Sequence, residues 1–164
     1  MKIGIISDTH SHMDEQVLKH LKGCDEIWHA GDVGDFDVIT QLAEIAPVKA
    51  VYGNIDDRSV RAELSEELIF TVDGCKVWMI HIGGYPPKYT KKIKEKLLQI
   101  KPDLFICGHS HILKVIPDKD LNLLHINPGA VGKKGFHKVR TFILLELVEG
   151  KPKKLDVVEL GKRI

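Results

Sequence analysis

Residues that bind metals well follow a series of short apolar runs in this chain, and this pattern constrains the fold more than any other feature. The clearest case is residues 1–7, whose isoleucines are followed at once by Asp8 and His10. Carboxylates and imidazoles are costly at the end of a buried strand unless they share a metal ion. Five separate segments supply such residues, and the full set is Asp8, His10, Asp32, Asn54, His81, His109 and His111. Mixed oxygen and nitrogen ligands of this kind are about what two adjacent divalent ions require.

The first third of the chain alternates between strand and helix patterns. Short apolar runs indicate buried strands at residues 1–7, 26–30 and 48–52. Helical spacing of apolar residues between them predicts helices over residues 14–22 and 36–45. Strands that alternate with helices form a parallel sheet, and sites in such sheets lie beyond the carboxyl ends of the strands. The polar residues that follow these strands are therefore expected to lie together.

The rest of the chain has mostly β patterns. Two β runs flank a tight-turn signal at Asp73-Gly74, and a Gly- and Pro-rich loop at 83–90 precedes a helical pattern at 91–100. Strand patterns occupy residues 68–72, 76–80, 103–107, 112–116, 121–126, 141–148 and 154–160. We interpret these strands as a second, mostly antiparallel sheet packed on the first. The prediction is an α/β fold, a four-layer α-β-β-α sandwich with two packed mixed β-sheets flanked by helices.

Length and composition exclude several other classes of protein. A chain of 164 residues has the size of one domain, so we expect residues 1–164 to form a single domain. A net charge of +1 gives no electrostatic case for a nucleic-acid partner. Three cysteines without a CxxC motif predict reduced thiols, and no apolar run is long enough for a signal-peptide core or a membrane span. Together these features predict a cytoplasmic protein without a membrane partner.

The motifs resemble those of the calcineurin-like metallophosphoesterase superfamily, and the resemblance covers nearly the whole chain. The family pattern is DxH, GD, GN, a histidine at a strand end and GHxH, and this chain has all five in that order. Each motif alone is weak, whereas five in order at predicted strand ends are specific. The short length, the segment Asn127-Pro128-Gly129-Ala130 and the β-rich tail are similar to the small YfcE-like phosphodiesterase branch of this superfamily.

This resemblance implies a metal-dependent phosphodiesterase, which is a phosphoric ester hydrolase. A hydroxide that bridges two metal ions would attack phosphorus in line with the leaving oxygen. The first ion would be held by Asp8, His10 and His111, the second by Asn54, His81 and His109, and Asp32 would bridge them. The residues expected to act in catalysis are Asp32, Asn54, His109 and Asp56, the last by orienting a neighbouring group. The ligand types suit Mn²⁺, Zn²⁺, Fe²⁺ or Ni²⁺ better than Ca²⁺, and Mn²⁺ is our first expectation.

Two departures from the family pattern bear on the substrate. Many relatives have GNHD as the third motif, and its histidine is thought to protonate the leaving group or bind the phosphate, whereas this chain has Ile55 there. General acid catalysis is worth on the order of 10²–10⁴ in rate, so its loss favours substrates with good leaving groups. Relatives also often have HGH where this chain has His81-Ile82-Gly83. The first departure favours a phosphodiester over a phosphomonoester, whereas the second keeps the ligand His81 and removes a second polar group near the substrate.

Two other functions remain open at this point. One is a phosphomonoesterase that acts on a small phosphorylated metabolite. The other is a protein-interaction scaffold like the retromer subunit Vps29, which resembles this branch. Such scaffolds lose metal ligands, whereas all seven are present here. The expected partner is a small phosphodiester substrate, and an exposed edge of the second sheet could pair with a second copy to form a homo-oligomer.

Several further polar residues have more than one interpretation. We interpret His29 as a packed or supporting histidine more than a ligand, and Asp35 and Asp37 as the start of a helix. His125 and His137 are expected to be structural or exposed. A substrate contact or an ordinary surface position are the two interpretations for the remaining residues, which are His12, Tyr85, Lys88, Tyr89, Lys133 and Lys134.

Overall fold

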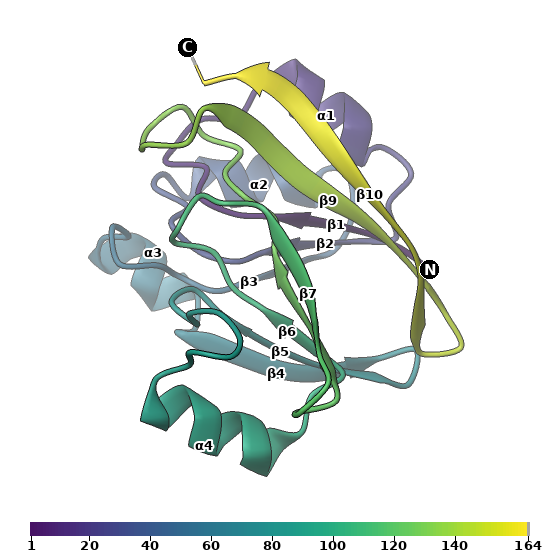
Figure 1. The fold of residues 1–164 in the computed structure, drawn as a ribbon. Coiled ribbons are helices and arrows are strands. Elements are labelled where there is room, and N and C mark those ends of the chain that lie inside the picture. The colour runs from purple at the N-terminus through teal and green to yellow at the C-terminus, as the bar shows by residue number, and fades with distance from the viewer. Residues whose placement is uncertain (164) are drawn as a thin grey trace.

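The computed structural model describes residues 1–163 and contains two five-stranded sheets with helices outside them (Figure 1). The first half of the chain forms β1 (Lys2–Ile6), α1 (Glu15–Leu21), β2 (Glu26–His29), α2 (Asp37–Ala43), β3 (Val48–Ala50), α3 (Arg58–Glu63), β4 (Glu67–Val72) and β5 (Cys75–Ile80). The second half forms α4 (Lys91–Ile100), β6 (Leu104–Ile106), β7 (Lys114–Asp118), β8 (Leu123–Asn127), β9 (Val139–Val148) and β10 (Lys151–Lys162). No helix within residues 1–163 is both long and apolar enough to cross a membrane.

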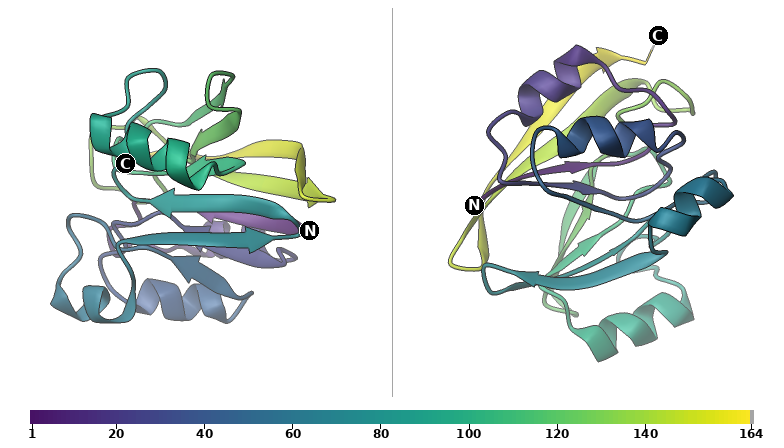
Figure 2. Two further views of the ribbon diagram at one scale, coloured as in Figure 1. Left: turned by 90° about the horizontal axis from the view of Figure 1, so that it is seen from below. Right: turned by 180° about the vertical axis from the view of Figure 1, so that it is seen from behind.

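Both sheets are mixed, as predicted. The first has the strand order β10-β9-β1-β2-β3, and its strands β1, β2 and β3 are parallel. The second has the order β4-β5-β6-β8-β7, and its central strands β5, β6 and β8 are parallel. In Figure 2, α1 and α2 cover the outer face of the first sheet, and α4 covers the outer face of the second. The predicted four-layer sandwich is therefore confirmed.

The predicted membership of the second sheet was wrong in two respects. β9 and β10 belong to the first sheet, where β9 pairs antiparallel with β1 and places Leu145 opposite Ile3. The second sheet is also not mostly antiparallel, because two of its pairings are parallel. β9 is buried on both faces, with Ile143 packed between the sheets and Phe142 packed toward the helices. Such a strand fits the middle of either sheet, so its apolar pattern does not identify its neighbours.

The helix α3 was not predicted. Val60 is its one buried residue, so the segment has no apolar periodicity to detect. Its N-terminus is nevertheless well defined, because the Asp57 carboxylate accepts hydrogen bonds from the backbone N–H groups of Ser59 and Val60.

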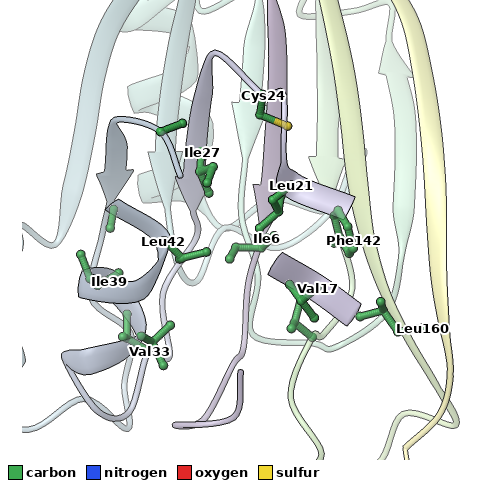
Figure 3. Packing of buried hydrophobic residues seen from close by; sticks show 14 of the residues in the cluster. Ile6, Val17, Leu21, Cys24, Ile27, Val33, Ile39, Leu42, Phe142 and Leu160 are labelled. Carbon is green, nitrogen blue, oxygen red and sulfur yellow. The ribbon is translucent and has the colours of Figure 1, made fainter. Parts of the chain in front are cut away.

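Three apolar layers hold the sandwich together. Along β1, Ile5 packs between the two sheets and Ile6 packs toward α1 and α2, as the alternation of side chains along a strand requires. Figure 3 shows this helix-facing layer, in which Leu21 and Leu42 approach Ile6 from the two helices. On the other side of the molecule, Trp78 and Phe105 stack with their ring centroids 4.7 Å apart, in the layer beneath α4.

This arrangement brings the carboxyl ends of β1, β2, β3, β5 and β6 to one end of the sandwich, at the left of Figure 1. The motifs predicted from the sequence follow these five strands directly. Contacts between the sheets close this end: the backbone N–H of His109, which follows β6, donates a 3.1 Å hydrogen bond to Asp8, which follows β1. The two sheets therefore share one site.

Two histidines, His29 and His125, lie buried on strands. The His125 ring on β8 packs against Phe105, and its Nδ1 lies 3.3 Å from the Tyr89 hydroxyl. Burial lowers the pKa of His125 to about 4 and that of His29 on β2 to about 4. Both rings are therefore neutral at pH 7, and His125 is structural, as expected.

The free energy of unfolding of the metal-free protein is expected to fall as the pH is lowered from about 6.5 to about 4. Unfolded histidine takes up a proton near pH 6.5, whereas His125 in the fold resists protonation until about pH 4, so the unfolded state binds more protons in this window. The loss for each ring is about 2 kcal/mol between pH 7 and pH 5. Urea unfolding at these two pH values measures it. His125→Gln should flatten the dependence, and an unchanged slope in that variant would contradict the assignment.

Candidate metal centre

The loops at this end of the sandwich bring the predicted ligands into two groups that share one residue. The first group is Asp8, His10, Asp32 and His111, and the second is Asp32, His81 and His109. Within each group, one ligand atom from every residue lies within 4.8 Å of the others. The loop of Asn54 meets the shared residue, because the backbone N–H of Ile55 donates a 3.1 Å hydrogen bond to Asp32 Oδ1. Six of the seven predicted residues thus lie in groups that share Asp32, and the loop of the seventh, Asn54, contacts Asp32 through the backbone of Ile55.

The backbone at five of these residues is left-handed. The φ angles are 54° at Asp8, 47° at His10, 54° at Asp32, 69° at His109 and 59° at His111. Residues other than glycine adopt such angles rarely, and they concentrate at functional sites where the surroundings hold them. The local backbone is therefore arranged to aim these side chains inward.

Asp8 has one carboxylate oxygen fixed by the protein and the other left open. Its Oδ2 accepts hydrogen bonds from the Ser7 hydroxyl at 2.6 Å and from the His109 backbone N–H at 3.1 Å. Its Oδ1 lies 3.1 Å from His111 Nε2 and 4.0 Å from His81 Nε2, and it has no hydrogen bond. An open carboxylate oxygen on a side chain that is 0% exposed needs a cation or a proton.

His81 likewise has one ring nitrogen with a hydrogen bond to the protein and one without. Its Nδ1 donates a 2.8 Å hydrogen bond to the carbonyl of Ala30, which leaves the lone pair of Nε2 facing the site. Nε2 lies 3.2 Å from Asp32 Oδ1 without the geometry of a hydrogen bond. Within residues 1–163, Asp8 Oδ1 and His81 Nε2 are the buried side-chain atoms that lack a hydrogen-bond partner. Both belong to predicted ligands, so the residues present fit divalent cations.

The charges of the site lead to the same conclusion. Burial alone would lower the pKa of His81, but the Asp32 and Asp8 carboxylates outweigh burial and raise it. Burial conversely would raise the pKa of Asp32, but His81, the Ile55 N–H and His10 lower it. The buried carboxylates therefore attract positive charge, which a divalent ion supplies more fully than one imidazolium.

His137 controls which nitrogen of His111 faces the site, a role that the sequence did not indicate. His137 Nε2 lies 3.0 Å from the Gly132 carbonyl and donates to it, so His137 Nδ1 is an acceptor. That acceptor lies 3.1 Å from His111 Nδ1, which must then carry its proton there. The lone pair of His111 Nε2 consequently faces His10 Nε2 at 3.3 Å. Two nitrogens at this distance fit a shared cation between them.

Asp56, predicted to act in catalysis, has its carboxylate occupied by the backbone. It accepts hydrogen bonds from the N–H groups of Val33 at 3.1 Å, Gly34 at 2.7 Å and Gly53 at 2.7 Å. These bonds join the loop after β2 to the loop after β3. Asp56 is therefore a positioning residue for the loops of Asp32 and Asn54.

Arg61 on α3 holds the same loop from outside and was missed in the sequence. Its Nε donates to the Asp56 carbonyl at 2.6 Å, and its Nη2 donates to the carbonyls of Gly53 at 3.1 Å and Asn54 at 3.3 Å. An arginine whose partners are backbone carbonyls has no motif of its own, so no sequence signal could have identified it.

Two of the motif glycines are required because a neighbouring side chain lies too close to the backbone for a Cβ atom. A Cβ added to Gly53 would overlap Asp32 Oδ1, and one added to Gly108 would overlap the Ser7 hydroxyl and approach Asp8 Oδ2 to 2.7 Å. The GN and GH motifs therefore have glycine because a carboxylate from another strand lies directly against the backbone.

The remaining candidates support the site or lie beside it. His29 is fully buried; its Nε2 lies 2.9 Å from the Thr9 hydroxyl and its Nδ1 accepts from the Gly31 N–H, so it supports the first two loops, as expected. His12 Nε2 lies 3.2 Å from Asp14. The Tyr85 hydroxyl bonds to Ser110, between two predicted ligands. Contacts of these residues with a substrate stay predictions.

Comparison with known proteins identifies the class that this fold and site define. Residues 1–150 match the calcineurin-like phosphoesterase superfamily domain, so the chain belongs to that family. A probable metallophosphoesterase of Methanothermobacter thermautotrophicus is 35% identical over 135 residues, which cover 79% of this chain and 77% of that protein. A phosphodiesterase of Methanocaldococcus jannaschii is 30% identical over 146 residues, which cover 79% of this chain and 83% of that protein.

Solved structures share the fold at lower identity. The structure of a novel archaeal phosphodiesterase has a TM-score of 0.80 and 22% identity, and the match covers 98% of this chain and 100% of that one. Vps29 of Entamoeba histolytica in complex with zinc has a TM-score of 0.73 and 20% identity, with 97% and 99% of the two chains covered. The predicted membership of the superfamily is confirmed, and both a protein named as a phosphodiesterase and Vps29 have this fold.

Substitution of His137 is expected to weaken metal binding without unfolding the protein. Asn at this position keeps an acceptor near the place of Nδ1, whereas Phe keeps the ring volume and removes the acceptor. We expect His137→Phe to lower the affinity for Mn²⁺ about 10- to 100-fold, and His137→Asn to lower it less, in calorimetric titration of the metal-stripped protein.

The control for this prediction is the tautomer of His111. Nitrogen NMR of the imidazole should show the proton on Nδ1 in the wild type and a mixture in His137→Phe. Equal affinity in the wild type and His137→Phe, with an unchanged His111 tautomer, would contradict the role of His137.

Proposed function

We propose that this protein is a metal-dependent phosphodiesterase with a dinuclear centre. The observation that carries the proposal is the sharing of Asp32 between two groups of ligands. The other ligands of the first ion would be Asp8, His10 and His111. The other ligands of the second ion would be Asn54, His81 and His109. The phosphodiesterase relative in Methanocaldococcus jannaschii supports the choice of reaction.

The predicted ligands differ in their exposure to solvent. Asp8, Asp32 and His81 are buried, whereas Asn54 and His109 are exposed. The substrate phosphate would therefore approach on the side of Asn54 and His109. Two adjacent divalent ions supply an activated water as nucleophile and neutralise charge on the phosphoryl oxygens.

The third motif supports a diester with a good leaving group. Ile55 stands where many relatives have a histidine, and its side chain is 44% exposed beside Asn54. An isoleucine cannot donate a proton, so an alkoxide would leave slowly, whereas an aryl oxide of low basicity leaves without help. This favours a phosphodiesterase over the phosphomonoesterase alternative.

We also propose which ion the centre binds, which class of substrate it hydrolyses and in which compartment the protein acts. Mn²⁺ is our first choice among the ions that oxygen and imidazole ligands accept, which also include Zn²⁺, Fe²⁺ and Ni²⁺. The three cysteines are buried and unpaired, which supports a reducing compartment such as the cytoplasm. A small phosphodiester is the proposed substrate, since an ionic centre of this kind recognises the phosphate alone.

Hydrolysis of bis-p-nitrophenyl phosphate by metal-stripped protein, with and without Mn²⁺, tests the proposal. We expect turnover that depends on Mn²⁺ and falls at least about 100-fold in Asp8→Asn, because the open oxygen of Asp8 is lost as an anionic ligand. Asp37→Asn is the matched control, since Asp37 lies at the start of α2 away from the ligand groups. Absence of turnover with any divalent ion would contradict the proposal.

Two further measurements separate the alternatives. Faster hydrolysis of p-nitrophenyl phosphate than of the diester would favour the phosphomonoesterase. Binding of Mn²⁺ or Zn²⁺ without turnover of either substrate would favour a Vps29-like scaffold, because the Vps29 of Entamoeba histolytica that shares this fold was solved in complex with zinc.

A further inference from the structure

A cleft of about 480 Å³ opens directly beside the candidate metal centre. Its inner end is formed by Asn54 and His81, both predicted ligands, and its outer part runs along α4. The volume lies within the range of sites for small ligands. A group esterified to a phosphate at the centre would therefore enter this cleft without crossing open solvent.

One wall of the cleft is a rigid stack of an arginine on a tyrosine. The guanidinium carbon of Arg61 lies 4.6 Å from the centre of the Tyr52 ring, and both residues line the cleft. Three hydrogen bonds from Arg61 to backbone carbonyls fix the plane of the guanidinium. A fixed planar cation on an aromatic ring is suited to stacking with another flat ring.

Part of the cleft lining is apolar. Ile80, Ile82, Ile93 and the fully buried Trp78 all line the cleft. Ile82 is 50% exposed. An exposed isoleucine in the lining favours an apolar occupant, which removes that surface from water.

The charged residues of the cleft nearly cancel. Lys96 forms an ion pair with Glu67, and Glu67 also accepts a 2.7 Å hydrogen bond from the Trp78 indole N–H. Glu66 and Lys92 add one charge of each sign at the rim. Arg61 adds a third positive charge, so the lining carries three positive and two negative side chains. The excess of one positive charge is on a guanidinium that already donates three hydrogen bonds to backbone carbonyls, which favours an uncharged occupant over a second phosphate.

We propose that this cleft binds one ester substituent of the phosphodiester, and that this substituent is an uncharged planar aromatic group, such as an aryl ring. The proposal rests on the proposed function, because the phosphate between the two substituents must lie at the metal centre. It assigns substrate selection to the side of the centre where Asn54 and His81 line the cleft.

The test compares two substrates with the same leaving group in the presence of Mn²⁺. Bis-p-nitrophenyl phosphate keeps an aryl substituent after reaction, and methyl p-nitrophenyl phosphate keeps a methyl group. Tyr52→Leu removes the ring, and Tyr52→Phe is the matched control. We expect Tyr52→Leu to raise the KM for the bis-aryl substrate about tenfold with little change in kcat, and Tyr52→Phe to behave as the wild type.

The response of the methyl substrate shows which substituent the cleft binds. An unchanged KM places the retained aryl group there, and an equal rise in KM places the leaving group there. Both results support an aryl site. An unchanged KM for both substrates in Tyr52→Leu would overturn the proposal, as would a fall in kcat alone, because the variant would then act through the loop of Asn54.

A second variant separates an effect on the cleft from a folding defect. Ile82→Ser changes a half-exposed side chain in the cleft lining. It should raise the KM for the bis-aryl substrate, as Tyr52→Leu does, at an unchanged unfolding temperature. A different result would contradict the proposed function. If the wild-type protein hydrolyses neither substrate in the presence of Mn²⁺, the protein is not a phosphodiesterase of the proposed kind. Hydrolysis of both substrates with no effect of either variant contradicts the cleft alone.

Discussion

The burial of two carboxylates at the ends of neighbouring parallel strands is the constraint on which the rest of this site depends. Asp8 follows β1 and is 0% exposed, and Asp32 follows β2 and is 2% exposed. An ionised carboxylate away from water is tolerable only with a counter-charge and hydrogen bonds. The imidazoles from four other loop positions and the backbone N–H groups around them supply part of that compensation, and a divalent ion would supply the rest.

The support around these carboxylates explains features that lie outside the ligand set. Left-handed backbone at residues other than glycine costs on the order of 1–3 kcal/mol each, and it persists only where the surroundings hold it. Asp56 holds three backbone N–H groups, and the Asn127 side chain donates to the Gly108 carbonyl at 2.8 Å and accepts from the Gly129 N–H at 3.0 Å. Such bonds fix the loops before any ion binds, which is the preorganisation that metal sites require.

The sequence predicts features that are encoded locally and misses those that depend on distant partners. Strand ends followed by Asp8, Asp32 and His81 are visible in a few residues each, so the layers and the ligand set could be predicted. β9 could not be assigned to its sheet, because a strand buried on both faces gives no sign of its neighbour. His137 could not be recognised either, since its role exists only because its loop folds back 26 positions to reach His111.

The two departures from the family pattern follow two predicted ligands that line the cleft, Asn54 and His81. Ile55 follows Asn54 and stands where many relatives have a histidine. Ile82 follows His81 and stands at the glycine of their HGH, with Gly83 in place of the second histidine. The two isoleucines are 44% and 50% exposed. Their side chains can neither donate a proton to a leaving oxygen nor hydrogen-bond a sugar-like substituent, but they gain free energy when an aromatic group covers them. Under the proposed function, the changes that remove polar groups from this site would therefore favour a substrate with an aromatic substituent and a good leaving group.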